Sequence, residues 1–106
     1  QIIFAQDLSL EMMLAAAPDE IINIYKSQLL AKEGAKDFLS DEKLINTIKA
    51  FFSANLNISK SATKLNVTRN TVNARLDKIK TLTGLSPKDF NDAVKLMVLL
   101  KAIDVK

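Results

Sequence analysis

The chain has 106 residues, of which 48% are hydrophobic, a formal net charge of +3 and no cysteine or histidine. This length supports one domain with one modest core, and the lack of cysteine excludes disulfides and thiolate metal sites. Because glycine and proline occur only twice each, few positions favour strand reversals, and we expect an all-α fold, a compact bundle of about five to six helices.

The N-terminal residues QIIFAQDLSL lack the basic region, long apolar stretch and cleavage site of a signal peptide. The longest apolar run, MVLLKAI, is far shorter than the roughly 20 residues that cross a bilayer. We therefore expect a cytoplasmic protein with no membrane partner. Since the first residue is Gln1 and not a starting methionine, we expect a piece of a longer protein or a trimmed leader.

Apolar spacing and start signals predict helices at about 9–16, 19–32, 41–54, 58–65, 68–82 and 87–103. At three starts a hydroxyl residue is flanked by the apolar pair of a hydrophobic staple. The predicted N-caps are Ser40, Thr68 and Ser86, and Gly34 and Gly84 suit C-terminal caps.

The joint between Gly34 and Asp41 divides the chain into two expected parts. Residues 1–39 are predicted to be an N-terminal helical segment that packs on, or links to, a helix-turn-helix domain at residues 40–106. Helix 41–54 has the apolar stripe of a core-facing helix, formed by Leu44, Ile45, Ile48, Phe51 and Phe52. The last helix is apolar on nearly every side, which is more surface than a small monomer usually covers.

Charge is distributed unevenly along the sequence. Residues 1–56 carry five lysines against eight acids, residues 57–82 carry six basic residues against Asp77, and residues 83–106 carry four lysines against three aspartates. The net charges are therefore −3, +5 and +1. The positive charge is concentrated in the segment NISKSATKLNVTRNTVNARLDKIKTL, residues 57–82.

The same segment has the spacing of a helix-turn-helix. Ala62 is the small residue at which two crossing helices pack closest, and Asn66 tolerates the left-handed conformation that the turn needs. The residues expected to form the shared core are Leu65, Val67, Val72, Leu76 and Ile79. We therefore predict that the second helix, about 68–82, enters the DNA major groove.

With that core face buried, polar side chains line the first turn and the opposite face of the second helix, where Asp77 is the one acid. Asparagine can pair with adenine and arginine with guanine, whereas threonine, lysine and free N–H groups favour phosphate. The predicted DNA-binding residues are Ser59, Lys60, Thr68, Arg69, Asn70, Thr71, Asn73, Ala74 and Lys78.

Each basic or polar residue also has a structural interpretation. Lys60, Lys64 and Lys80 would individually be ordinary solvated lysines. Asn66 is expected to be a turn residue and not a DNA contact. Arg75 lies near the buried stripe, and both a DNA contact and a structural ion pair are open for it.

The stretch NISKSATKLNVTRNTVNARLDKIKTLTGL resembles the C-terminal helix-turn-helix of PucR/CdaR-type bacterial transcriptional regulators, and the shorter Fis-type helix-turn-helix is similar. The resemblance rests on Asn57-Ile58-Ser59, Ala62, Leu65, Val67, Arg69-Asn70-Thr71-Val72, Arg75-Leu76, Ile79 and Gly84-Leu85, and covers about residues 41–103. The family often has His or Arg at the positions of Asn66, Thr68 and Asn73, so this recognition helix is less basic than many. The resemblance implies a promoter-binding domain whose upstream portion senses a metabolite.

Two other function classes compete with DNA binding. An enzyme is not expected, because His, Cys and a Gly-rich loop are absent and the acid pairs Asp19-Glu20 and Asp41-Glu42 suit helix starts. We likewise expect no cofactor and no metal. A helical protein-interaction or dimerisation module without DNA binding would explain the last helix but not the charge segregation. A homodimer would explain both the apolar last helix and the charge segregation. Its two recognition helices would lie ~34–36 Å apart, and the final helix or the N-terminal helices would be buried between the subunits.

Overall fold

The computed structural model describes residues 10–105, and in this part every element is a helix. The elements are α1 (Leu10–Ala16), α2 (Asp19–Leu29), α3 (Ala35–Ser40), α4 (Glu42–Ser53), α5 (Ile58–Leu65), α6 (Arg69–Thr83) and α7 (Phe90–Val105). The predicted all-α class is confirmed, with α3 as an additional helix. The predicted start of the first helix at Ser9 lies outside the described residues.

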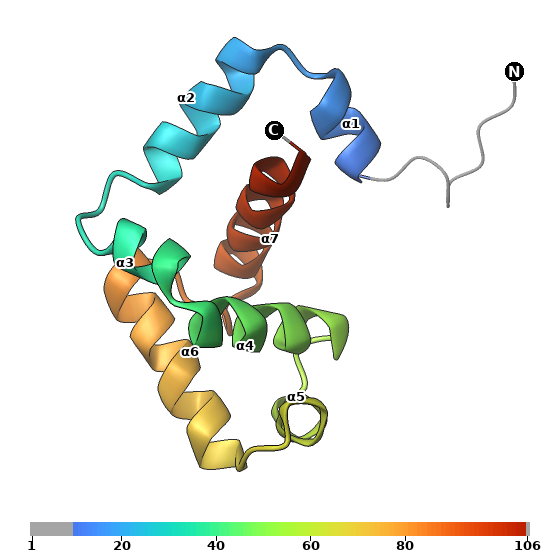
Figure 1. The fold of residues 1–106 in the computed structure, drawn as a ribbon, viewed down its shortest axis with the longest axis vertical. Coiled ribbons are helices and arrows are strands. Elements are labelled where there is room, and N and C mark those ends of the chain that lie inside the picture. Colours follow the sequence, from blue (N-terminus) through green and yellow to red (C-terminus); the bar gives the residue numbers. More distant parts are fainter. Residues whose placement is uncertain (1–9, 106) are drawn as a thin grey trace, which may run out of the picture.

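The core lies where α4 and α6 meet α3, α5 and α7 (Figure 1). Its buried side chains come from all five helices: Phe38, Leu44, Ile48, Phe51, Ala62, Val72, Leu76, Ile79, Leu96 and Leu100. The predicted apolar stripe of α4 is confirmed, because three of its members are buried and Ile45 and Phe52 pack partly buried against the same core.

Gly34 has a different role from the predicted helix C-cap. Helix α2 ends at Leu29, and Gly34 precedes α3 with an ordinary helical φ of −75°. A Cβ at Gly34 would lie 2.7 Å from the carbonyl oxygen of Leu82 and 2.9 Å from its Cα. The prediction was therefore wrong: glycine is required here because the start of α3 passes directly over the backbone of α6.

The predicted N-caps Ser40 and Ser86 are also wrong. The capping residue lies one position later at Asp41 and three positions later at Asp89. Ser40 is the last residue of α3, where its hydroxyl donates to the carbonyl of Lys36, and the carboxylate of Asp41 caps α4 by accepting from the N–H of Leu44 (3.2 Å). Helix α7 begins at Phe90, because the Asp89 carboxylate accepts from the N–H of Asp92 (3.1 Å). In both places a nearby aspartate carboxylate caps the helix N-terminus, where the helix dipole favours a negative charge.

Helices α1 and α2 flank α7 at the end of the molecule away from α5 (Figure 1). The Tyr25 hydroxyl donates to the carbonyl of Lys95 (3.1 Å), and the Lys101 amine donates to Glu11 (3.0 Å). Leu96 and Leu99 are fully buried, so the chain itself covers much of the apolar surface of α7. No helix within residues 10–105 has the length and apolar character to cross a membrane.

Candidate nucleic-acid interface

The turn between α5 and α6 is fixed by a left-handed residue. Asn66 has φ 56° and ψ 46°, its N–H donates to the carbonyl of Thr63, and the N–H of Val67 donates to the carbonyl of Ala62 (3.0 Å). This pair of hydrogen bonds is a Schellman motif, which closes a helix and redirects the chain. Ala62 is buried and belongs to the hydrophobic core. The predicted left-handed turn at Asn66 is therefore confirmed, and the burial of Ala62 agrees with its predicted place between the helices.

Helix α6 begins and ends where the sequence indicates. The Thr68 hydroxyl accepts from the N–H of Thr71 (3.2 Å) and lies 3.0 Å from the Thr71 hydroxyl, and Gly84 closes the helix with φ 78°. Val72, Leu76 and Ile79 are buried. Because these apolar residues fix the rotation of α6, its opposite face is turned outward.

The predicted site residues lie on two helices that pack against each other, α5 and α6. Ser59 and Lys60 are exposed on the first turn of α5, and Thr71 and Asn73 on α6 are half-buried. The remaining predicted residues are exposed and belong to α6 or its cap: Thr68, Arg69, Asn70, Ala74 and Lys78. At ~100° per residue, Asn70, Ala74 and Asp77 share a stripe about 60° wide opposite Val72.

The start of α5 depends on a residue whose role the sequence reasoning missed. The Asn57 side chain accepts from the N–H of Lys60 (2.8 Å), and its backbone carbonyl accepts from the buried Ser61 hydroxyl (2.6 Å). Asparagine immediately before an apolar-periodic segment is a known N-cap signal. Asn57 thereby fixes the backbone that carries Ser59 and Lys60.

Arg75 and Lys64 make contacts with α4. The Arg75 guanidinium donates to the Thr47 hydroxyl (3.3 Å), and Thr47 is fully buried and donates to the carbonyl of Lys43 (2.7 Å). The Lys64 amine donates to the Ser53 hydroxyl (2.8 Å). These contacts favour the structural interpretation of Arg75, although its partner is a hydroxyl and not the carboxylate of an ion pair.

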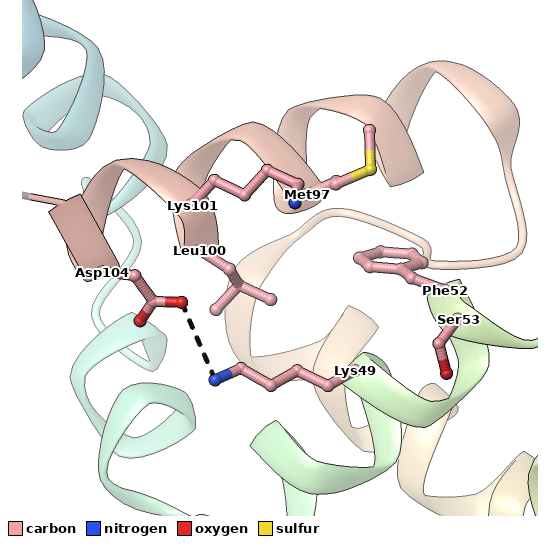
Figure 2. A pocket seen from close by; sticks show the side chains of 7 residues that line it. All are labelled: Lys49, Phe52, Ser53, Met97, Leu100, Lys101 and Asp104. Carbon is pink, nitrogen blue, oxygen red and sulfur yellow. Dashed lines mark ion pairs between the residues drawn. The ribbon is translucent and has the colours of Figure 1, made fainter. Parts of the chain in front are cut away.

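A concave site lies apart from these residues, between α4 and α7 (Figure 2). Its lining residues are Lys49, Phe52, Ser53, Met97, Leu100, Lys101 and Asp104. Lys49 lies 3.9 Å from Asp104, and Lys101 lies 3.0 Å from Glu11, a hydrogen bond that lowers the pKa of the Glu11 carboxyl. The described residues contain no group of three or more metal-ligating side chains. The cleft is thus mainly apolar, and acids balance both of its lysines.

Comparison with known proteins shows the family of the helix-turn-helix. The family model of the PucR C-terminal helix-turn-helix domain matches residues 44–102, which are α4 to α7. The chain belongs to this family. The match agrees with the expected span of about 41–103. Membership implies DNA binding in a transcriptional regulator, and such regulatory domains are typically not enzymes.

Curated relatives from Bacillus subtilis (strain 168) extend the similarity to the N-terminal helices. The uncharacterized protein YsfB is 32% identical over 102 residues, 96% of this chain and 26% of that protein. The purine catabolism regulatory protein is 30% identical over 101 residues, 95% of this chain and 18% of that protein. The chain therefore spans about a quarter or less of these relatives. No solved structure matches it.

Proposed function

We propose that this chain is the DNA-binding domain of a bacterial transcriptional regulator that acts in the cytoplasm and inserts α6 into the major groove of double-stranded DNA. The observation that carries the proposal is the rotation of α6. Burial of Val72, Leu76 and Ile79 leaves Asn70, Ala74 and Lys78 exposed on the other side. Family membership and the local net charge of +5 in residues 57–82 support the same function.

The predicted site residues, exposed or half-buried, divide into two proposed roles. Arg69 and Asn70, in the first turn of α6, are proposed to read base edges together with Asn73, and Ala74 leaves room for close approach to a thymine methyl group. Ser59, Lys60, Thr68, Thr71 and Lys78 are proposed to contact phosphates and sugars. Phosphate contacts position a protein on DNA, whereas base contacts give it sequence preference.

These roles predict different effects of substitution. Arg69→Ala and Asn70→Ala should each reduce discrimination between the preferred duplex and a mixed-sequence duplex by about tenfold, which corresponds to one lost base contact. Lys60→Ala should weaken binding to both duplexes by the same factor and lower the salt dependence. The measurement is a fluorescence titration of each variant on both duplexes.

Arg75→Ala is the matched control, because the same residue type on the same helix faces Thr47 of α4. It should lower stability and leave the discrimination ratio unchanged. Equal losses of discrimination in the Arg69, Lys60 and Arg75 variants would contradict the assignment of roles.

The second part of the proposal is a homodimer, in which two copies of α6 lie ~34–36 Å apart, one turn of DNA. It is supported by apolar side chains left exposed on α1 and α2, which are Met12, Met13, Ile21 and Ile24, and by Phe90 at the start of α7, 71% exposed. An effector, if one acts, is proposed to bind a portion of the full protein outside this chain. The division at residue 39 stays a prediction.

The dimer predicts a concentration-dependent molecular mass. Sedimentation equilibrium should show a reversible monomer–dimer equilibrium, and Ile21→Glu together with Ile24→Glu should shift it to monomer, because charges would enter an apolar interface. Lys36→Glu, an exposed site on α3, is the control. A wild-type chain that stays monomeric at high concentration would count against a dimer formed by this domain.

A further inference from the structure

Asp77 is an acid on the face of α6 that is proposed to face DNA. It is the one acidic residue in residues 57–82, and its side chain is 74% exposed. It follows Asn70 by seven residues, two helical turns, and so continues the stripe that Asn70 begins on the face opposite Val72. A carboxylate there lies close to two phosphate strands when α6 is in the groove, and this repulsion weakens binding unless the carboxylate makes a compensating contact.

Lys88 reaches Asp77 from the turn between α6 and α7. Its Nζ lies 3.9 Å from Oδ1 of Asp77. The turn is well anchored: Pro87 is fully buried, the N–H of Asp89 donates to the carbonyl of Ser86 (3.1 Å), and the N–H of Ser86 donates to Asp92 (3.0 Å). An exposed ion pair contributes little to stability. Stability of the fold therefore gives no sufficient reason for an acid at this position.

We propose that Asp77 determines part of the sequence specificity by accepting a hydrogen bond from the exocyclic amino group of cytosine in the major groove. Lys88, whose Nζ lies 3.9 Å from the carboxylate, offsets the negative charge of Asp77 near the phosphates. The inference rests on the proposed function, since it requires α6 in the groove. An ionised carboxylate only accepts hydrogen bonds, and cytosine presents a donor, N4–H₂, whereas guanine presents the acceptors O6 and N7 and thymine the acceptor O4. Adenine also presents a donor, N6–H₂, but its acceptor N7 lies beside it and repels the second carboxylate oxygen, so cytosine is the better partner.

The distance along α6 places Asp77 over a different base pair from Asn70. Seven residues at 1.5 Å each place it about 10 Å along α6 from Asn70, which is about three base-pair steps on B-form DNA. Asn70 and Asp77 therefore read different positions. Loss of Asp77 should remove the preference at one base pair and leave the preference near Asn70 intact.

The test is selection of duplexes from a pool with randomised sequence, using the wild-type chain, Asp77→Asn and Asp104→Asn. Asp104 is the matched control: it also pairs with a lysine at 3.9 Å, its side chain is 61% exposed, and it lies near the C-terminal end of α7, well apart from α6 in Figure 1. We expect wild type and Asp104→Asn to enrich cytosine at one position. In Asp77→Asn the preference for cytosine over guanine at that position should fall about tenfold.

Lys88→Ala separates charge compensation from base reading. It should weaken binding to every duplex and keep the preferred base, because the carboxylate is still present. Thermal unfolding of Asp77→Asn checks that this exposed substitution leaves the fold intact. If wild type and Asp77→Asn select the same base at every position, the inference is wrong while DNA binding stands. If the wild-type chain binds no duplex, both the proposed function and the inference fail.

Discussion

At the scale of single residues, the two glycines act through different physical causes. Gly84 has a left-handed φ of 78°, and the nearest atom to an added Cβ would be a flexible part of Lys32 at 3.5 Å. Gly34 has an ordinary φ of −75° but no space, because the backbone of Leu82 lies below 3 Å from the Cβ position. Glycine is favoured at residue 84 by the backbone conformation and is required at residue 34 by close packing.

Gly34→Ala should therefore destabilise the protein by about 1–3 kcal/mol, because the new methyl group forces α3 away from α6. Without the steric clash the same substitution would stabilise by about 0.4–1 kcal/mol, since alanine restricts the unfolded chain. Urea unfolding of the variant and the wild type measures the sign of this change in the free energy of unfolding. A variant as stable as the wild type, or more stable, would show that α3 does not pass this close to α6.

At the scale of elements, α4, α5 and α6 were predictable because each has a strong local signal. The apolar stripe of α4, the spacing of Ala62 and Asn66, and the Thr68 cap all lie within one helix or one turn. Amphipathic spacing fixes which face is buried, so the outward face of α6 could also be predicted. The identity of the bases that it reads could not, because base contacts depend on the DNA.

Helix α3 and two helix starts were not predictable from local signals. A six-residue helix such as α3 is unstable alone, and it forms because Ala35 and Phe38 are buried against neighbouring helices. Adjacent residues such as Ser40 and Asp41 are both good caps, and tertiary packing selects between them. The Arg75–Thr47 contact joins residues 28 apart, so no local pattern indicates it.

At the scale of the whole molecule, the proposed DNA surface and the exposed apolar side chains of α1 and α2 lie at different ends (Figure 1). The two helices of the helix-turn-helix lie at one end in Figure 1, and α1 and α2 lie around α7 at the other. Residues 1–56, with a net charge of −3, repel phosphate, whereas residues 57–82 attract it. In the proposed complex, this separation would orient the chain on DNA with α6 toward the groove and leave α1 and α2 available for a second copy.

The central claim, DNA binding through α5 and α6, predicts a steep dependence of affinity on salt, because each phosphate neutralised by a lysine or arginine releases counterions. The direct measurement is a fluorescence titration of the wild-type chain on mixed-sequence duplex as salt is raised. Neutralising about four phosphates would weaken binding roughly 100-fold between about 50 and 200 mM salt. Absence of binding at low salt, or binding that salt leaves unchanged, would contradict the account.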